Sequence, residues 1–133
     1  MGVSRSLTQI DLSNNFLRVE GGKAIAEGIA VSRSLTSIGL KLNQIGAEGW
    51  GAIFAAVCGS ANYNIMSIDA SNEKLGVAAA KAVAKALQDS ASPSLTQIDL
   101  SNNTLCGVYL ENGTYGDLMG TYNAEGIKAI ADA

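Results

Sequence analysis

Apolar and polar residues follow two patterns that succeed each other along the chain. Between residues 9 and 13 they alternate strictly, with Ile10 and Leu12 apolar between polar neighbours, and this predicts a half-buried strand. From residue 21 onward, small and aliphatic residues recur at intervals of three and four, which predicts the buried stripe of a helix. The expected stripes are Gly21, Ala24, Ile25, Gly28 and Ile29; Gly49, Ala52, Ile53, Ala56 and Val57; Ala79, Ala82, Val83, Ala86 and Leu87; and Gly126, Ala129, Ile130 and Ala133.

The change from strand to helix occurs four times. The decapeptide SLTQIDLSNN stands at residues 6–15 and again, letter for letter, at residues 94–103, and diverged copies lie between them. The first apolar residues of the copies are spaced by 28, 30 and 30 residues and are Leu7, Leu35, Ile65 and Leu95. We predict one domain over residues 1–133, with repeats at about 6–33, 34–63, 64–93 and 94–133, because one such unit cannot bury its apolar face alone.

Three copies fit the pattern L-x-x-I-x-L-x-x-N-x-L, namely SLTQIDLSNNFL, SLTSIGLKLNQI and SLTQIDLSNNTL. With this period and a full helix in each unit, the chain resembles the ribonuclease-inhibitor type of leucine-rich repeat, which also forms the sensing ends of NOD-like receptors. The stretch LCGV followed by GTYNAEGIKAIADA is similar to insertions in arrays of protists, especially algae. The resemblance implies an α/β solenoid of about four repeats, with a curved parallel sheet on the concave side and helices on the convex side.

The resemblance also implies an asparagine ladder, in which the residue closing each strand segment hydrogen-bonds backbone groups of the adjoining turns. The matching positions are Asn15, Asn43 and Asn103. The third copy has Glu73 instead, and a charged carboxylate buried without a partner would cost several kcal/mol. We expect a looser turn there, with Glu73 either rotated outward or bound to a donor.

Outward residues of stacked strands form columns at a spacing of about 4.8 Å. The columns are Gln9, Ser37, Ser67 and Gln97; Asp11, Gly39, Asp69 and Asp99; and Ser13, Lys41, Ser71 and Ser101. Three interpretations are open: a solvated face copied by duplication, a surface for a basic segment of a partner, or a divalent cation held by Asp69 and Asp99. Of these positions, the predicted partner contacts are Gln9, Asp11, Ser13, Lys41, Asp69, Gln97 and Asp99.

The fourth unit contains about 17 additional residues near residues 106–123. This insertion carries Tyr109, Tyr115 and Tyr122 among glycines, which is typical of adaptable contact loops. We expect a contact site; a loop that folds back over the solenoid edge and a neutral insertion are the alternatives. Trp50 lies beside the second helical stripe, where packing is favoured over a binding role.

Composition excludes several classes of function. The chain is 47% apolar, has a net charge of −3 without a basic cluster, and contains no histidine, the commonest general base. Cys58 and Cys106 are expected to be reduced thiols, and no phosphate-binding loop, signal peptide or membrane span is visible. We predict no enzyme activity, cofactor, metal or nucleic acid, and an intracellular, cytoplasmic location.

The preferred function is a non-catalytic recognition module that binds a protein through the concave face and the tyrosine loop. Neither end carries a polar capping unit, so we expect a fragment of a longer array or ends covered by a partner or a second copy. The alternative function is therefore a structural or assembly subunit held through these ends. A GTPase-activating role, known for one leucine-rich repeat family, ranks lower.

Overall fold

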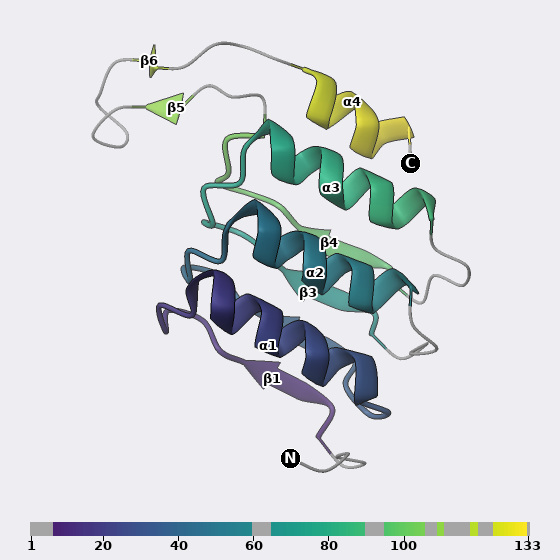
Figure 1. The fold of residues 1–133 in the computed structure, drawn as a ribbon. Helices are drawn as coiled ribbons and strands as arrows, with labels where there is room; N and C mark the ends of the chain where they lie inside the picture. Colours follow the sequence, from purple (N-terminus) through teal and green to yellow (C-terminus); the bar gives the residue numbers. More distant parts are fainter. Residues whose placement is uncertain are drawn as a thin grey trace.

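Strands and helices alternate along the chain (Figure 1). The computed structural model describes residues 7–59, 65–89, 95–105, 109–110, 118–119 and 124–132. The elements in chain order are β1 (Gln9–Asp11), α1 (Arg18–Val31), β2 (Ser37–Gly39), α2 (Gly46–Gly59), β3 (Ser67–Asp69), α3 (Val77–Gln88), β4 (Gln97–Asp99), β5 (Tyr109–Leu110), β6 (Leu118–Met119) and α4 (Glu125–Asp132).

The first four strands form one parallel sheet in the order β1-β2-β3-β4. Ile10 pairs with Ile38, Ile38 with Ile68, and Ile68 with Ile98, so each strand takes the register that the repeat predicts. The side chains of the two inner isoleucines are buried because they have a strand on both sides. The predicted α/β solenoid of about four repeats is confirmed.

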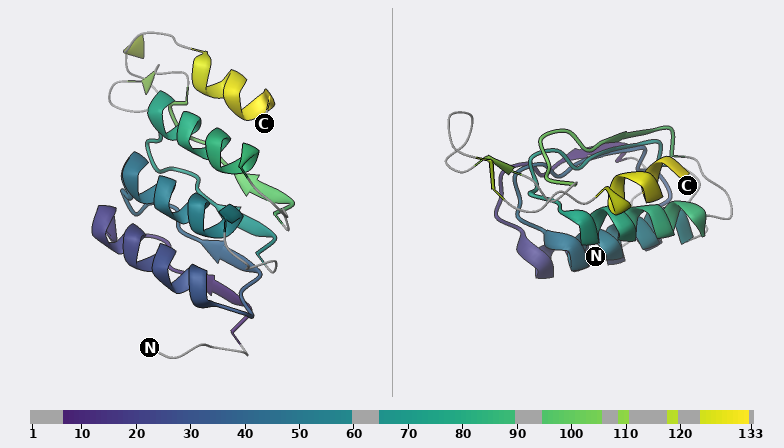
Figure 2. Two further views of the ribbon diagram at one scale, coloured as in Figure 1. Left: turned by 45° about the vertical axis from the view of Figure 1, so that its right-hand side comes forward. Right: turned by 90° about the horizontal axis from the view of Figure 1, so that it is seen from above.

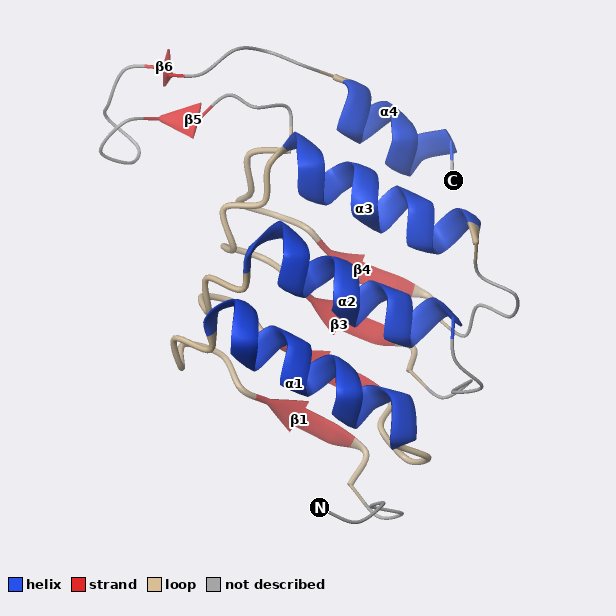
Figure 3. Ribbon diagram, viewed as in Figure 1, coloured by secondary structure: helices blue, strands red, loops and turns tan. Residues whose placement is uncertain are grey.

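Helices and strands occupy separate layers, with the sheet on one face and α1 to α4 on the other (Figures 2 and 3). Adjacent parallel strands lie about 4.8 Å apart, whereas packed helices need about 8–10 Å between their axes. Stacking such units bends the array toward the sheet, so we call the outer surface of this sheet the concave face.

The core lies between the two layers and is centred on α2. Trp50, Ile53 and Phe54 are fully buried, and the rings of Trp50 and Phe54 lie 5.8 Å apart. The predicted packing role of Trp50 is therefore confirmed. The predicted stripe of α1 was partly wrong: Ala24 is exposed, while Gly22 and Ala26 are buried. The buried face is rotated because α1 packs against α2 as well as against the sheet.

Two glycines of α1 provide a matched test of this packing. A Cβ at Gly22 would lie 2.5 Å from the buried Ile45 and 3.3 Å from the backbone of Gly49, whereas nothing lies within 4 Å of a Cβ at Gly28. We expect Gly28→Ala to raise the free energy of unfolding by about 0.5–1 kcal/mol. Gly22→Ala should lower it by about 1–3 kcal/mol through overpacking. Urea unfolding followed by circular dichroism measures both, and equal effects would contradict the close packing of α1 on α2.

Candidate functional site

Asparagine side chains close the turns that follow the strands and so fix the rim of the concave face. Asn43, fully buried, accepts a hydrogen bond from the Asn15 backbone N–H at Oδ1 (2.7 Å) and donates from Nδ2 to Leu12 and Leu40 carbonyls (2.9 Å each). Asn103 accepts the Glu73 and Leu75 N–H groups at Oδ1. Nδ2 of Asn15 donates to two carbonyls of its own turn. The side-chain amides of Asn43 and Asn103 therefore connect neighbouring repeats, whereas that of Asn15 stabilises its own turn.

Glu73 occupies the asparagine position of the third repeat and is 3% exposed. Its carboxylate accepts the backbone N–H groups of Asn43, Gln44 (3.1 Å) and Ile45 (3.0 Å), as well as Nε1 of Trp50 (2.9 Å). The expectation of a looser turn was wrong, because the longer side chain with two oxygens satisfies four donors. Of the two alternatives expected for Glu73, the structure shows the second: the side chain is not rotated outward but accepts hydrogen bonds from donors.

The concave face carries the three polar columns that the repeat predicts. Gln9, Asp11, Gln97 and Asp99 are exposed, and Asp69 is half-buried. In the third column Lys41 and Ser101 are exposed and Ser13 is half-buried, but Ser71 is only 4% exposed. Ser71 is thus more deeply buried than its counterparts in this column, although its hydroxyl donates to Asp69 as Ser101 donates to Asp99.

The three aspartates of the concave face share one local geometry. In each case Oδ1 accepts both the backbone N–H and the hydroxyl of the serine two residues later, at 2.9 and 2.6 Å for Asp99 and Ser101. Hydrogen bonds from Ser13 and Ser101, and to a smaller extent the charge of Lys41, hold the pKa of Asp11 and of Asp99 below its ordinary value. The carboxylates of Asp11 and Asp99 are thus held in the ionised form at neutral pH. The serine hydrogen bonds fix Oδ1 of all three aspartates and leave Oδ2 of each available for a cation.

Gly39 interrupts the aspartate column in the second repeat. The structure pairs Gly39 with Asp11 on one side and Asp69 on the other, so only Asp69 and Asp99 are direct neighbours. Among the residues that the structure describes, no group of three or more histidine, cysteine, aspartate or glutamate side chains could hold a metal ion. The aspartates of the first and third repeats are therefore separated by a strand that carries no carboxylate at this position.

The tyrosine loop is described only in part. Tyr109 lies in β5, which pairs with β6 as an antiparallel ribbon through Tyr109 and Met119. Tyr115, Tyr122 and Cys106 lie outside the described residues. Figure 1 shows β5 and β6 beyond β4, on the side of the strand-to-helix turns.

The turns between strands and helices contain two exposed apolar residues that the sequence interpretation missed. Phe16 is 63% exposed at a φ of 51°, and Leu42 is 47% exposed at a φ of 60°. A left-handed backbone costs a residue other than glycine about 1–2 kcal/mol. At the positions that match Leu42, the other repeats carry Asn14, Asn72 and Asn102, and asparagine tolerates this conformation best. The available signal was an apolar residue at a turn position that is polar in the other repeats, which carry Gln44, Lys74 and Thr104 at the position of Phe16.

The helix face contains an open groove of about 330 Å³ between α2 and α3, lined mainly by glycine and alanine. Cys58 lies at its base, where burial raises the pKa of the thiol, and no disulfide partner is formed. A thiol that stays protonated is a poor nucleophile.

In the described part of the chain, no helix is long and apolar enough to cross a membrane. The family model described as Leucine Rich repeat matches residues 3–26 and 31–54, which cover most of the first two strand-helix units. No curated protein matches this chain. The family match and the four-stranded parallel sheet agree with each other.

Proposed function

Because the chain folds as a leucine-rich repeat solenoid, a type of repeat that generally mediates protein-protein interaction, we propose that it binds a basic segment of a protein partner on its concave face. The observation that carries the proposal is the column of Asp11, Asp69 and Asp99, each anchored through Oδ1 by its own serine with Oδ2 left over. Fixed carboxylates lose little freedom on binding, so they recognise lysine or arginine at low entropic cost.

The other predicted contacts surround this column. Gln9 and Gln97 are exposed at the outer strands and offer amide groups to a partner backbone, and Ser13 supports Asp11. Lys41 is exposed beside the acidic column. It gives the face one positive position, so a matching segment carries an acidic residue at that register.

The size of the sheet requires a second contact region. Four strands span only about 15–20 Å, which gives less than the roughly 800 Å² per partner of a standard interface. We assign the additional contact to the loop at 106–123 with Tyr109, Tyr115 and Tyr122, since tyrosine provides a large contact area at low entropic cost. The period of 28 to 30 residues supports the ribonuclease-inhibitor subtype within the same proposal.

The decisive experiment neutralises three carboxylates without changing their shape. In the triple variant Asp11→Asn, Asp69→Asn, Asp99→Asn, Oδ1 still accepts the serine hydrogen bonds, so the fold should persist. The matched control Glu27→Gln, Glu48→Gln, Asp89→Asn makes the same charge change at exposed positions in α1, in α2 and at the end of α3. We expect a partner captured from source-cell lysate by the wild type to be bound at least about tenfold more weakly by the concave-face variant and normally by the control.

Equal capture by both triple variants would refute the concave-face assignment. A third variant, in which a short glycine linker replaces residues 107–122, tests the tyrosine loop separately. If capture is lost only in this variant, the loop alone is the site. If the isolated wild-type chain self-associates and captures nothing, the role of an assembly subunit is supported instead.

A further inference from the structure

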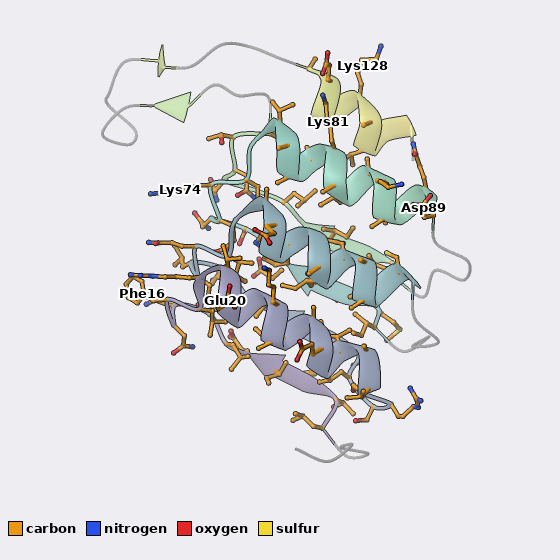
Figure 4. The ribbon with its side chains drawn as sticks, in the orientation of Figure 1. Phe16, Glu20, Lys74, Lys81, Asp89 and Lys128 are labelled. Carbon is orange, nitrogen blue, oxygen red and sulfur yellow. The ribbon has the colours of Figure 1, made fainter. Side chains whose placement is uncertain are left out.

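A second surface runs along the strand-to-helix turns, at the edge of the concave face. We call it the turn edge and define it by Phe16, Arg18, Lys41, Leu42 and Lys74, all of which are exposed. Figure 4 shows Phe16 and Lys74 projecting from the same side of the molecule, away from the helices. The concave-face proposal uses only Lys41 of this set.

The two apolar residues of the turn edge are close along the backbone although they belong to different repeats. The Asn14 N–H donates to the Lys41 carbonyl (2.9 Å), and the Asn15 N–H donates to Asn43 Oδ1 (2.7 Å). Leu42 therefore lies between two residues that are bonded directly to the turn of Phe16. Because both side chains are held outward from a left-handed backbone by a network that crosses the repeats, their exposure is a fixed feature of the fold.

The charges of the turn edge are positive in a chain whose net charge is −3. Within the described ranges, ion pairs join Lys23 to Glu48, Lys81 to Glu125 and Lys85 to Asp89, so these three pairs involve no cation of the turn edge. Acidic groups near this edge include Asp11 and Asp99 of the concave face, which lie close enough to Lys41 to interact with its charge. Glu73 is turned inward onto four N–H donors, and Glu20 lies in the first turn of α1.

We propose that the turn edge binds an acidic protein segment through apolar side chains that pack on Phe16 and Leu42, while Arg18, Lys41 and Lys74 pair with its carboxylates. Charge complementarity selects this partner over a basic segment, which the same cations repel. An apolar centre with a polar rim is the usual anatomy of a protein interface. The short strands β5 and β6 also lie on the side of the strand-to-helix turns (Figure 1).

The first test separates binding from folding. Leu42→Asn and Phe16→Asn introduce a residue that tolerates a positive φ, and asparagine already stands at the three positions that match Leu42. If the side chains of Phe16 and Leu42 stabilise the fold, the melting temperatures of both variants must fall below that of the wild type. If they serve binding, each variant should melt at the wild-type temperature or about 3 °C above it. A fall of the melting temperature in both variants would overturn the proposal.

The second test measures binding to a defined probe by NMR titration of the ¹⁵N-labelled chain. The probe is a synthetic acidic peptide with one phenylalanine and one leucine. In one control peptide alanine replaces both apolar residues, and in the other lysine replaces the acidic residues. We expect shifts of the amides of residues 14–18, 41–44 and 72–74 with the first peptide alone. Phe16→Asn, Leu42→Asn and Lys74→Glu should each weaken it at least about tenfold, whereas the matched surface control Lys128→Glu should not.

The inference would be overturned by the absence of shifts at the turn edge, by equal binding of the edge variants and the wild type, or by binding of phosphatidylserine vesicles through Phe16 and Leu42. Self-association at the same concentrations, measured by sedimentation, would instead assign the edge to a second copy and would also overturn it. The concave-face triple variant serves as a further control. If this variant binds the acidic peptide as the wild type does, the turn edge binds without the concave-face aspartates. A failure of the concave-face proposal then leaves the turn-edge proposal standing.

Discussion

Replacement of Glu73 with alanine is expected to lower the free energy of unfolding by about 3–5 kcal/mol. The variant leaves four buried donors, three backbone N–H groups and the Trp50 indole, without their acceptor. Domains of this kind are stable by only about 5–15 kcal/mol, so much of the fold's stability depends on this one carboxylate. Urea unfolding followed by circular dichroism measures the loss.

A double-mutant cycle identifies the cause. Glu73→Asn restores the residue of the other repeats but cannot serve the Trp50 indole, which then stays unpaired. Adding Trp50→Phe removes that donor, so the double variant should be more stable than the sum of the two single effects predicts, by about 0.5–3 kcal/mol. Strict additivity would show that Glu73 and Trp50 do not interact and that the destabilisation has another origin.

Replacement of Trp50 with alanine is also expected to cost about 3–5 kcal/mol, chiefly by creating a cavity. The side chain is fully buried and contacts Phe54 in the centre of the core, and it belongs to the helix that packs against both α1 and α3. Unfolding must be followed by circular dichroism, because Trp50 is the single tryptophan of the chain and its fluorescence is lost with it.

Trp50→Phe is the matched control for this prediction. It keeps most of the buried volume and removes one hydrogen bond to Glu73, so it should cost about 1–2 kcal/mol. If Trp50→Ala lowers the free energy of unfolding no more than Trp50→Phe does, the core around α2 relaxes to fill the cavity. The close packing around Trp50 would then contribute little to stability.

The sequence predicts the strand register because equivalent residues recur at a fixed interval, and a parallel stack places them side by side. It predicts the aspartate column for the same reason. Nothing in the pattern shows that Oδ1 of each aspartate is occupied by a serine, since Asp-x-Ser becomes visible as a unit only when the turn geometry is known. The repeat boundaries and the binding role of the tyrosine loop stay predictions.

The pairing of Glu73 with Trp50 was missed because each residue was considered within its own repeat. Trp50 stands where Gly22 and Ala80 stand in the neighbouring repeats, and Glu73 stands where the others have asparagine. The two exceptions compensate each other across 23 positions of sequence. Phe16 and Leu42 were missed for a related reason: an apolar residue in a turn departs from the repeat without breaking any periodic pattern.

At the asparagine positions of the first three repeats, the backbone N–H is satisfied by a side chain of the following repeat. The N–H of Asn15 is satisfied by Asn43, that of Asn43 by Glu73, and that of Glu73 by Asn103, each from 28 or 30 residues downstream. During synthesis, every turn must therefore wait for the following repeat to leave the ribosome before its donors are satisfied. At about 5–20 residues per second this delay is about 2–6 s, so the nascent array should gain its structure one repeat behind translation.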